Sequence, residues 1–187
     1  MRRLIQFVGA AVMSAAVSGC LSDGGALTAR ADRPREAPAD GPITSAPEGT
    51  CHYRDALPDP QCTPGDRDSR VTPDNISSTI CVQGWSKQVR PPASVTEPLK
   101  FERVHAYGVT APAKTIALDH LIAISLGGAT STANLWPQSW DGDAGAHKKD
   151  QLEDRLHALV CAGEVPLAQA QDEIASDWLA AYQKYIG

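Results

Sequence analysis

Apolar residues recur at helical spacing in the last quarter of the chain. Between residues 146 and 160 they fall on one face, and Gly163 follows as a stop signal, which predicts a helix over this range. A final helix is expected from Pro166 onward, because apolar residues again line one side. The first face consists of Leu152, Leu156, Leu159 and Val160, and the second of Leu167, Ala170, Ile174, Trp178, Leu179 and Tyr182.

A strand–turn–strand arrangement is expected directly before these helices. Residues 115–124 form an apolar run with β-branched side chains, and the length of this run favours a strand. Leu126-Gly127-Gly128 supplies a turn, and residues 134–137, which read Asn-Leu-Trp-Pro, predict a brief second strand. This order of elements predicts an α+β fold in which a hairpin is followed by a helix and then by a packing helix.

The region before the hairpin contains fewer regular elements. Prolines and glycines punctuate residues 51–73, so we expect an irregular segment that is pinned by its cysteines. A short helix is predicted over residues 72–81, because the Thr-Pro pair at its start suits an N-cap and a first helical position. A helix is also predicted over residues 97–107, with Pro98 in its first turn.

The N-terminus has the form of an export signal. Arg2 and Arg3 precede an uncharged apolar run over residues 4–17, which is too short to span a bilayer comfortably. The run ends in Val-Ser-Gly directly before Cys20, and small residues before a cysteine resemble the lipobox of bacterial lipoproteins. The resemblance implies that residues 1–19 are a signal peptide and that Cys20 is lipidated. An ordinary signal peptide with an incidental cysteine is the alternative.

The stretch that follows predicts a tether. Residues 20–50 are rich in Ala, Gly, Pro, Asp and Thr and lack a periodic apolar pattern, so they are not expected to fold. The folded domain is expected over residues 51–187. Leu21 stands where enteric lipoproteins kept at the inner membrane have Asp, which favours the outer membrane. We therefore expect a lipid-anchored protein of the cell envelope, with secretion as the alternative.

Four further cysteines indicate disulfides. An even number of cysteines in an exported chain is typical of two disulfide bonds. Three pairings are possible and the sequence does not choose among them, although we favour a local loop and a long-range bond. None of the cysteines lies in a Cys-x-x-Cys pair, which argues against a structural zinc site. The favoured pairs are Cys51 with Cys62 and Cys81 with Cys161.

The charge of the chain argues against general affinity for nucleic acid. The formal net charge is −5, whereas non-specific nucleic-acid binders usually carry a basic face. Contact with phosphate would need a local basic cluster. Lys148 and Lys149 at the start of the helix after the hairpin are candidates, as is Arg90, and a solvated helix turn is the alternative interpretation of the two lysines.

The predicted hairpin carries residues suited to phosphodiester hydrolysis. This reaction needs a base to deprotonate water and a cation to neutralise the phosphate. Asp119-His120 lies on the first strand, and an amide oxygen from Asn134 on the second would be a hard ligand for Mg²⁺ or Mn²⁺. These residue types therefore predict a metal-dependent hydrolytic site.

The order Asp119-His120, Gly127-Gly128, Asn134-Leu135 resembles the HNH nuclease superfamily. The looser pattern of the chain also looks like a set of exported bacterial proteins of this type. The resemblance implies a small ββα-metal core that holds one divalent ion. It assigns the general base to His120, a metal ligand to Asp119, and to Asn134 either the orientation of the base or metal binding.

The third metal ligand of this resemblance departs from the family pattern. His147 is a candidate, but it lies farther from Asn134 than the family spacing. Asp143 occupies the usual spacing and Asp150 follows one turn later, so either could take the place. The alternative is that His147 is a solvent-facing helix residue and the metal has only two protein ligands.

We therefore expect a metal-dependent HNH endonuclease that hydrolyses DNA or RNA outside the cytoplasm. Mg²⁺ or Mn²⁺ would be the cofactor, nucleic acid the substrate, and the membrane a partner through the lipid on Cys20. No protein partner is indicated. The alternative function is a non-catalytic exported module that uses the same fold to bind a cell-envelope component, which the acidic balance of the chain favours.

Overall fold

Two short strands form an antiparallel hairpin near the middle of the chain. The computed structural model describes residues 49–187, so the predicted signal peptide, Cys20 and nearly all of the tether lie outside the described residues. β1 (Ile116–His120) pairs with β2 (Leu135–Ser139), with Asp119 opposite Trp136. Together with the helices described below, this hairpin confirms the α+β class.

β1 ends earlier than the apolar run predicts. The run extends to Ile124, but β1 stops at His120. After one further backbone bond, from the Leu121 N–H to the Asn134 carbonyl oxygen, the next acceptor is a side chain. The Ile122 N–H donates to Oδ1 of Asn134 at 2.9 Å, so the ladder cannot continue. Ile124 then begins a short 3-10 turn, η3 (Ile124–Leu126).

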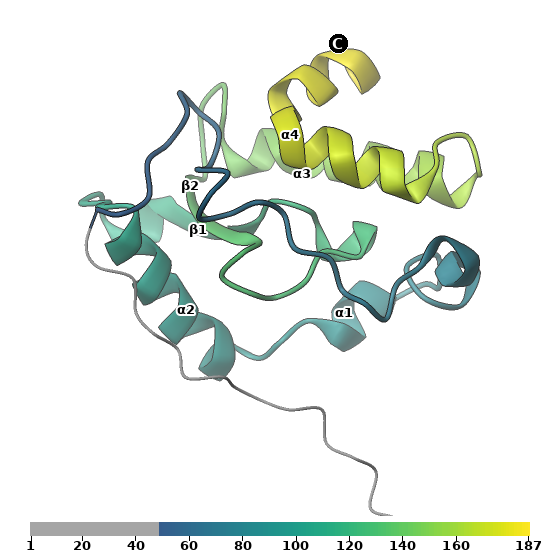
Figure 1. Cartoon of the computed structure of the whole chain (residues 1–187), viewed down its shortest axis with the longest axis horizontal. Coiled ribbons are helices and arrows are strands. Elements are labelled where there is room, and N and C mark those ends of the chain that lie inside the picture. Colours follow the sequence, from purple (N-terminus) through teal and green to yellow (C-terminus); the bar gives the residue numbers. More distant parts are fainter. Residues whose placement is uncertain (1–48) are drawn as a thin grey trace, which may run out of the picture. The chain divides into compact units, whose positions relative to one another are not determined.

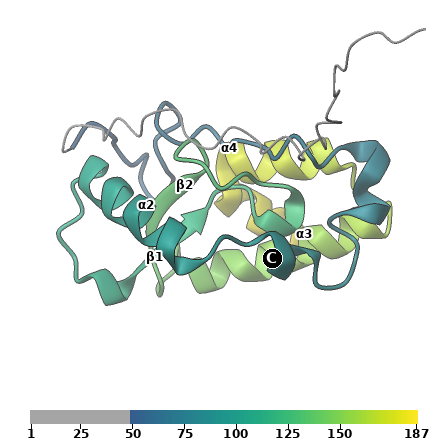
Figure 2. The ribbon, with the colours of Figure 1, turned by 90° about the horizontal axis from the view of Figure 1, so that it is seen from below.

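One helix, α2 (Ala93–Ala106), packs on the strands of the hairpin, and the last two helices pack on the turn η3 between the strands (Figures 1 and 2). α3 (Ala146–Cys161) and α4 (Leu167–Tyr185) lie side by side after β2, where helices were predicted. Their apolar faces meet in a buried core, and apolar side chains of the loop between the strands also pack into this core. Its fully buried members include Leu126, Leu152, Leu156, Ile174 and Trp178.

α4 is divided by a break that the apolar pattern does not reveal. Asp177 has extended backbone angles of φ −160° and ψ 90° inside the helix. Its carboxylate accepts the Ala180 N–H at 2.9 Å, which is the bond of an N-cap side chain. Asp177 therefore ends the first part of α4 and caps the second.

The helices before the hairpin differ from the prediction in their bounds. α2 (Ala93–Ala106) begins four residues earlier than expected, so Pro98 lies inside it. The predicted helix over residues 72–81 is instead a 3-10 segment, η1 (Pro73–Ser78), in which Asn75 accepts the Thr72 N–H. The short helix α1 (Trp85–Val89) and the turn η2 (Ala113–Thr115) were not predicted.

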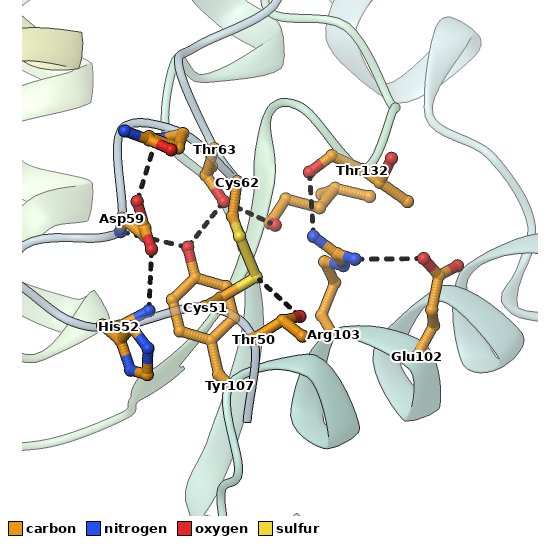
Figure 3. Close-up of a disulfide and its surroundings, with 12 residues drawn as sticks. Thr50, Cys51, His52, Asp59, Cys62, Thr63, Glu102, Arg103, Tyr107 and Thr132 are labelled. Atoms are coloured by element: carbon orange, nitrogen blue, oxygen red, sulfur yellow. Dashed lines mark hydrogen bonds and ion pairs between the residues drawn. A yellow bond between two sulfur atoms is a disulfide. The ribbon is translucent and has the colours of Figure 1, made fainter. Parts of the chain in front are cut away.

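The irregular segment before η1 is fastened to the hairpin and to α2 (Figure 3). The Asp59 carboxylate accepts the N–H groups of His52 and Gln61, which closes the loop on itself. The Tyr107 hydroxyl, at the end of α2, accepts the Asp59 N–H and lies 2.7 Å from Oγ1 of Thr63. These bonds replace regular structure in a segment rich in proline.

Both favoured disulfides are present. Cys51 is joined to Cys62 across 11 residues, and Cys81 to Cys161 across 80 residues. The first bond closes the irregular loop, and the second ties the segment before α1 to the end of α3. Two disulfides indicate an oxidising environment, consistent with a protein outside the cytoplasm. None of the helices among residues 49–187 has the length and apolar character needed to cross a membrane.

We predict that the long-range disulfide contributes more to stability than the local one. Because a longer loop loses more chain entropy on closure, removing Cys81–Cys161 should cost about 4 kcal/mol and removing Cys51–Cys62 about 3 kcal/mol. The measurement is urea denaturation of the variants Cys81→Ser/Cys161→Ser and Cys51→Ser/Cys62→Ser. An equal or reversed cost would contradict the prediction.

Candidate functional site

The loop between the strands is built around two glycines and one asparagine. Gly127 has a φ of 75°, in the left-handed region where glycine is favoured, and it ends η3. A Cβ on Gly128 would lie 1.7 Å from the carbonyl oxygen of Ile122 and 2.8 Å from Nδ2 of Asn134. The Gly-Gly pair is therefore needed for the turn and for close approach to Asn134.

The side chain of Asn134 closes this loop and does not face a ligand. Its Oδ1 accepts the Ile122 N–H, and its Nδ2 donates to the carbonyl oxygens of Ile122 and Ala129, each at 2.9 Å. The residue is 0% exposed. These contacts do not support Asn134 as a metal ligand, because its amide group is committed to the backbone of the loop. Asn134 can act on His120 only through that loop, which carries Thr130.

A buried ion-pair cluster joins the end of β1 to α3. Nζ of Lys149 lies 2.9 Å from Oδ2 of Asp119 and donates to the His120 carbonyl oxygen at 2.7 Å. It also pairs with Glu153 one turn along α3. The Trp136 indole N–H donates to the same Asp119 oxygen at 2.9 Å. Oδ2 of Asp119 thus accepts hydrogen bonds from the Lys149 ammonium and the Trp136 indole.

Lys149 is therefore not a surface residue. Its side chain is 0% exposed, which corrects the prediction that it contacts nucleic acid. Despite burial, the two carboxylates hold its pKa above the ordinary value, so the ammonium stays charged. Burial raises the pKa of Glu153. Sequence reasoning missed the cluster, although Lys149 lies three residues before Leu152 and seven before Leu156, on the apolar face of α3.

The other two basic candidates lie closer to solvent. Lys148 is partly exposed and its Nζ lies 4.7 Å from the ring centre of Tyr182 on α4. Arg90 is exposed and its charge acts on His120. Both positions remain compatible with contact to a phosphate.

His120, at the end of β1, is an uncharged imidazole at neutral pH. Burial, with the nearby charges of Arg90 and Lys149, lowers the pKa of His120 to about 3. Its Nε2 lies 2.9 Å from Oγ1 of Thr130 in the loop. Where Nε2–H donates to that hydroxyl, Nδ1 carries the lone pair. A neutral imidazole offers one nitrogen lone pair as a proton acceptor, and the lowered pKa makes it a weaker base than a free imidazole.

The third-position candidates lie at the start of α3 and in the loop before it. His147 is 64% exposed in its side chain, with Asp141 and Asp150 at 3.9 Å and 3.8 Å from its ring nitrogens. Burial and the Asp119 carboxylate raise the pKa of Asp150. Asp143 is exposed. His147 therefore faces solvent beside two carboxylates.

The predicted metal ligands do not form a closed set. Asn134 is excluded by its bonds, and Oδ2 of Asp119 is taken by Lys149 and Trp136. Among residues 49–187, the only three His, Cys, Asp or Glu ligand atoms that lie within 4.8 Å of one another belong to Cys81, His157 and Cys161, and the two sulfurs are joined in the disulfide. The Mg²⁺ or Mn²⁺ cofactor remains a prediction that these contacts do not support.

A pocket of about 330 Å³ borders His120 through its hydrogen-bond partner. Thr130, Ala129 and Gly128 form one part of its wall, and Arg67 and Arg70 another. Each arginine pairs with an aspartate, Arg67 with Asp172 and Arg70 with Asp68. Val89 and Pro91, on either side of Arg90, also line it. Sequence reasoning missed Arg67 and Arg70, because they belong to the irregular segment.

Comparison of the chain with protein-family models, with curated proteins and with solved structures finds no match. The interpretation of the site therefore depends on its own geometry.

We predict that Asn134→Asp destabilises the protein. A carboxylate cannot donate to the carbonyl oxygens of Ile122 and Ala129, so two bonds of a fully buried side chain become repulsive contacts, at a cost of about 3 kcal/mol. Asn75→Asp is the matched control, because Asn75 is partly exposed and should cost about 1 kcal/mol. Urea denaturation measures both. A stable Asn134→Asp protein that binds a divalent ion would restore the ligand role.

Proposed function

We propose that the chain is an HNH-type nuclease that hydrolyses phosphodiester bonds of DNA or RNA outside the cytoplasm. The observation that carries the proposal is the neutral imidazole of His120 beside an arginine-lined pocket. The order of elements, two antiparallel strands followed by a helix, also agrees with the ββα core that the sequence resemblance implies.

In the proposed reaction, His120 is the general base. The imidazole takes a proton from water, and the water oxygen forms a bond to phosphorus while the bond from phosphorus to the leaving oxygen breaks. The leaving oxygen takes a proton from solvent. The Lys149 contact to the His120 carbonyl oxygen and the Thr130 contact to Nε2 fix the backbone and ring of this residue.

The proposed substrate path follows the pocket next to His120. Phosphate groups are bound by guanidinium groups through charge-assisted hydrogen bonds. Arg67 and Arg70 line the pocket, and Arg90 lies between two of its lining residues. The aspartates that pair with Arg67 and Arg70 hold these side chains in place and reduce their charge, so we expect modest affinity without sequence preference.

The metal that the resemblance implies would supply a Lewis acid at the phosphate. Because the predicted ligands do not form a closed set, no step of the proposed reaction passes through a metal ion.

We also propose that the protein is exported and anchored by lipid on Cys20. The two disulfides support an oxidising compartment, and the N-terminal pattern supports cleavage before Cys20. The anchor would hold the domain at the cell envelope.

A second candidate function is a non-catalytic module that binds a cell-envelope component. Two observations favour it. The net charge of the chain is −5, and Oδ2 of Asp119, the predicted metal ligand, is paired with Lys149. Nuclease activity in the assay below would decide against it.

We predict that the purified full chain degrades plasmid DNA or RNA and that His120→Ala abolishes this activity, because the proposed reaction transfers the proton of water to this imidazole. The assay is run with Mg²⁺, with Mn²⁺ and with chelator. The matched control is His105→Ala, an exposed histidine on α2, which should leave the rate unchanged.

The pH profile provides a second readout. Because the pKa of His120 is lowered to about 3, its base form persists as the pH falls, and the rate should stay flat from about pH 8 to about pH 5. Activity that survives His120→Ala, or no degradation under any condition, would overturn the proposal.

We predict that Cys20→Ser releases the protein from the membrane fraction, because the substitution removes the proposed site of the lipid. Fractionation of cells that express the two forms, followed by detection of the protein, measures this. A Cys20→Ser protein that stays in the membrane fraction would show that Cys20 is not the anchor.

A further inference from the structure

The ammonium group of Lys149 is placed where the sequence resemblance expects a metal ion to meet Asp119. It lies 2.9 Å from Oδ2 of Asp119, pairs with Glu153 and donates to the carbonyl oxygen of His120 at 2.7 Å. Three oxygen atoms thus surround one buried cation. Carboxylate and carbonyl oxygens are the same ligand types that a hard divalent ion would use.

Contacts from β1 and α3 hold the Lys149 ammonium in one position, so it is a fixed part of the fold. Lys149 is 0% exposed and comes from the first turn of α3, while Asp119 and His120 end β1. The indole N–H of Trp136 completes the donors to Oδ2 of Asp119. A metal ion could reach that oxygen only by displacing Lys149 and leaving its charge buried and unpaired, at a large cost.

The remaining ligands near the site are too few to hold an ion by themselves. Asn134 is committed to the backbone of Ile122 and Ala129. His147 and Asp150 do not come within 4.8 Å of Asp119 as a set of three ligand atoms. Among residues 49–187, the donors found for Asp119 bond Oδ2 and leave Oδ1 open, and one carboxylate oxygen is a weak site for a divalent ion.

We infer that the Lys149 ammonium is the resident cation of this hairpin and that the protein holds no divalent metal ion at Asp119. Lys149 fixes the Asp119 carboxylate and the His120 backbone, and it is buried away from the pocket where the substrate would lie. It is therefore a positioning residue. The chemical meaning of this inference rests on the proposed nuclease function, whereas its statement about metal binding does not.

The charges of the cluster explain why removal of Lys149 should create a metal site. Asp119 and Glu153 both point at the ammonium and would face each other across an empty space without it. Two carboxylates and the carbonyl oxygen of His120 then form a site suited to a hard divalent ion.

The test is titration of the full chain, purified in detergent and freed of metal, with Mn²⁺ followed by electron paramagnetic resonance. The signal of free Mn²⁺ falls when the ion binds, so the assay is independent of nuclease activity. The expected result is that the natural chain and Asp119→Asn bind the same amount of Mn²⁺. Lys149→Met should gain one ion per chain, and Lys149→Met/Asp119→Asn should lose it again.

Lys148→Met is the matched control, since it makes the same substitution one residue earlier, outside the cluster. It should bind as the natural chain does. An ion bound by the natural chain and lost in Asp119→Asn would overturn the inference, whether it binds alone or only when a short oligonucleotide is present on the His120→Ala chain. A folded Lys149→Met protein that gains no ion would also overturn it.

Circular dichroism shows whether each variant folds. If Lys149→Met does not, the comparison of the natural chain with Asp119→Asn decides by itself. The plasmid assay separates the two proposals: degradation in the presence of chelator supports both. Absence of degradation under every condition ends the nuclease proposal, and the Mn²⁺ titration then still decides the inference.

Discussion

The buried contact between Lys149 and Asp119 is the constraint on which the hairpin depends. The ammonium group joins the last residues of β1 to the first turn of α3, and removing either residue leaves the other without its charge partner. A buried ion pair contributes little when compared with apolar residues of similar size, but breaking one partner is strongly destabilising. The contact therefore fixes how the helix lies on the strands more than it adds to overall stability.

A second constraint acts on the loop that joins the strands. Beyond the paired strands, the side chain of Asn134 makes three hydrogen bonds to the backbone of the loop. Gly128 allows them because a Cβ at that position would collide with Ile122 and Asn134. The pattern Gly-Gly followed by Asn is thus a structural signature of a closed loop. It presents Thr130 to His120 and places one wall of the pocket next to the imidazole.

Much of this architecture could be predicted from the sequence, because periodic apolar residues report which face of an element is buried. The helices after the hairpin and the two strands followed from such patterns. The even number of cysteines predicted two disulfides, but their pairing came only from the structure. The roles of Asn134 and Lys149 did not, since a polar residue in a sequence gives no sign of whether its partner is solvent, backbone or a distant carboxylate. The position of Lys149 on the apolar face of α3 was the available signal. The early start of α2 was hidden by Pro98, which usually marks a first turn.

The two disulfides differ in when they can form. If the chain crosses a membrane from its N-terminus, Cys51 and Cys62 emerge close together and can pair at once, whereas Cys81 must wait until Cys161 has followed it 80 residues later. During that interval Cys81 is a lone thiol, and early closure of the first bond removes the two neighbours with which it could mispair. In a chain exported in this way, the spacing of the cysteines therefore determines which disulfide forms first.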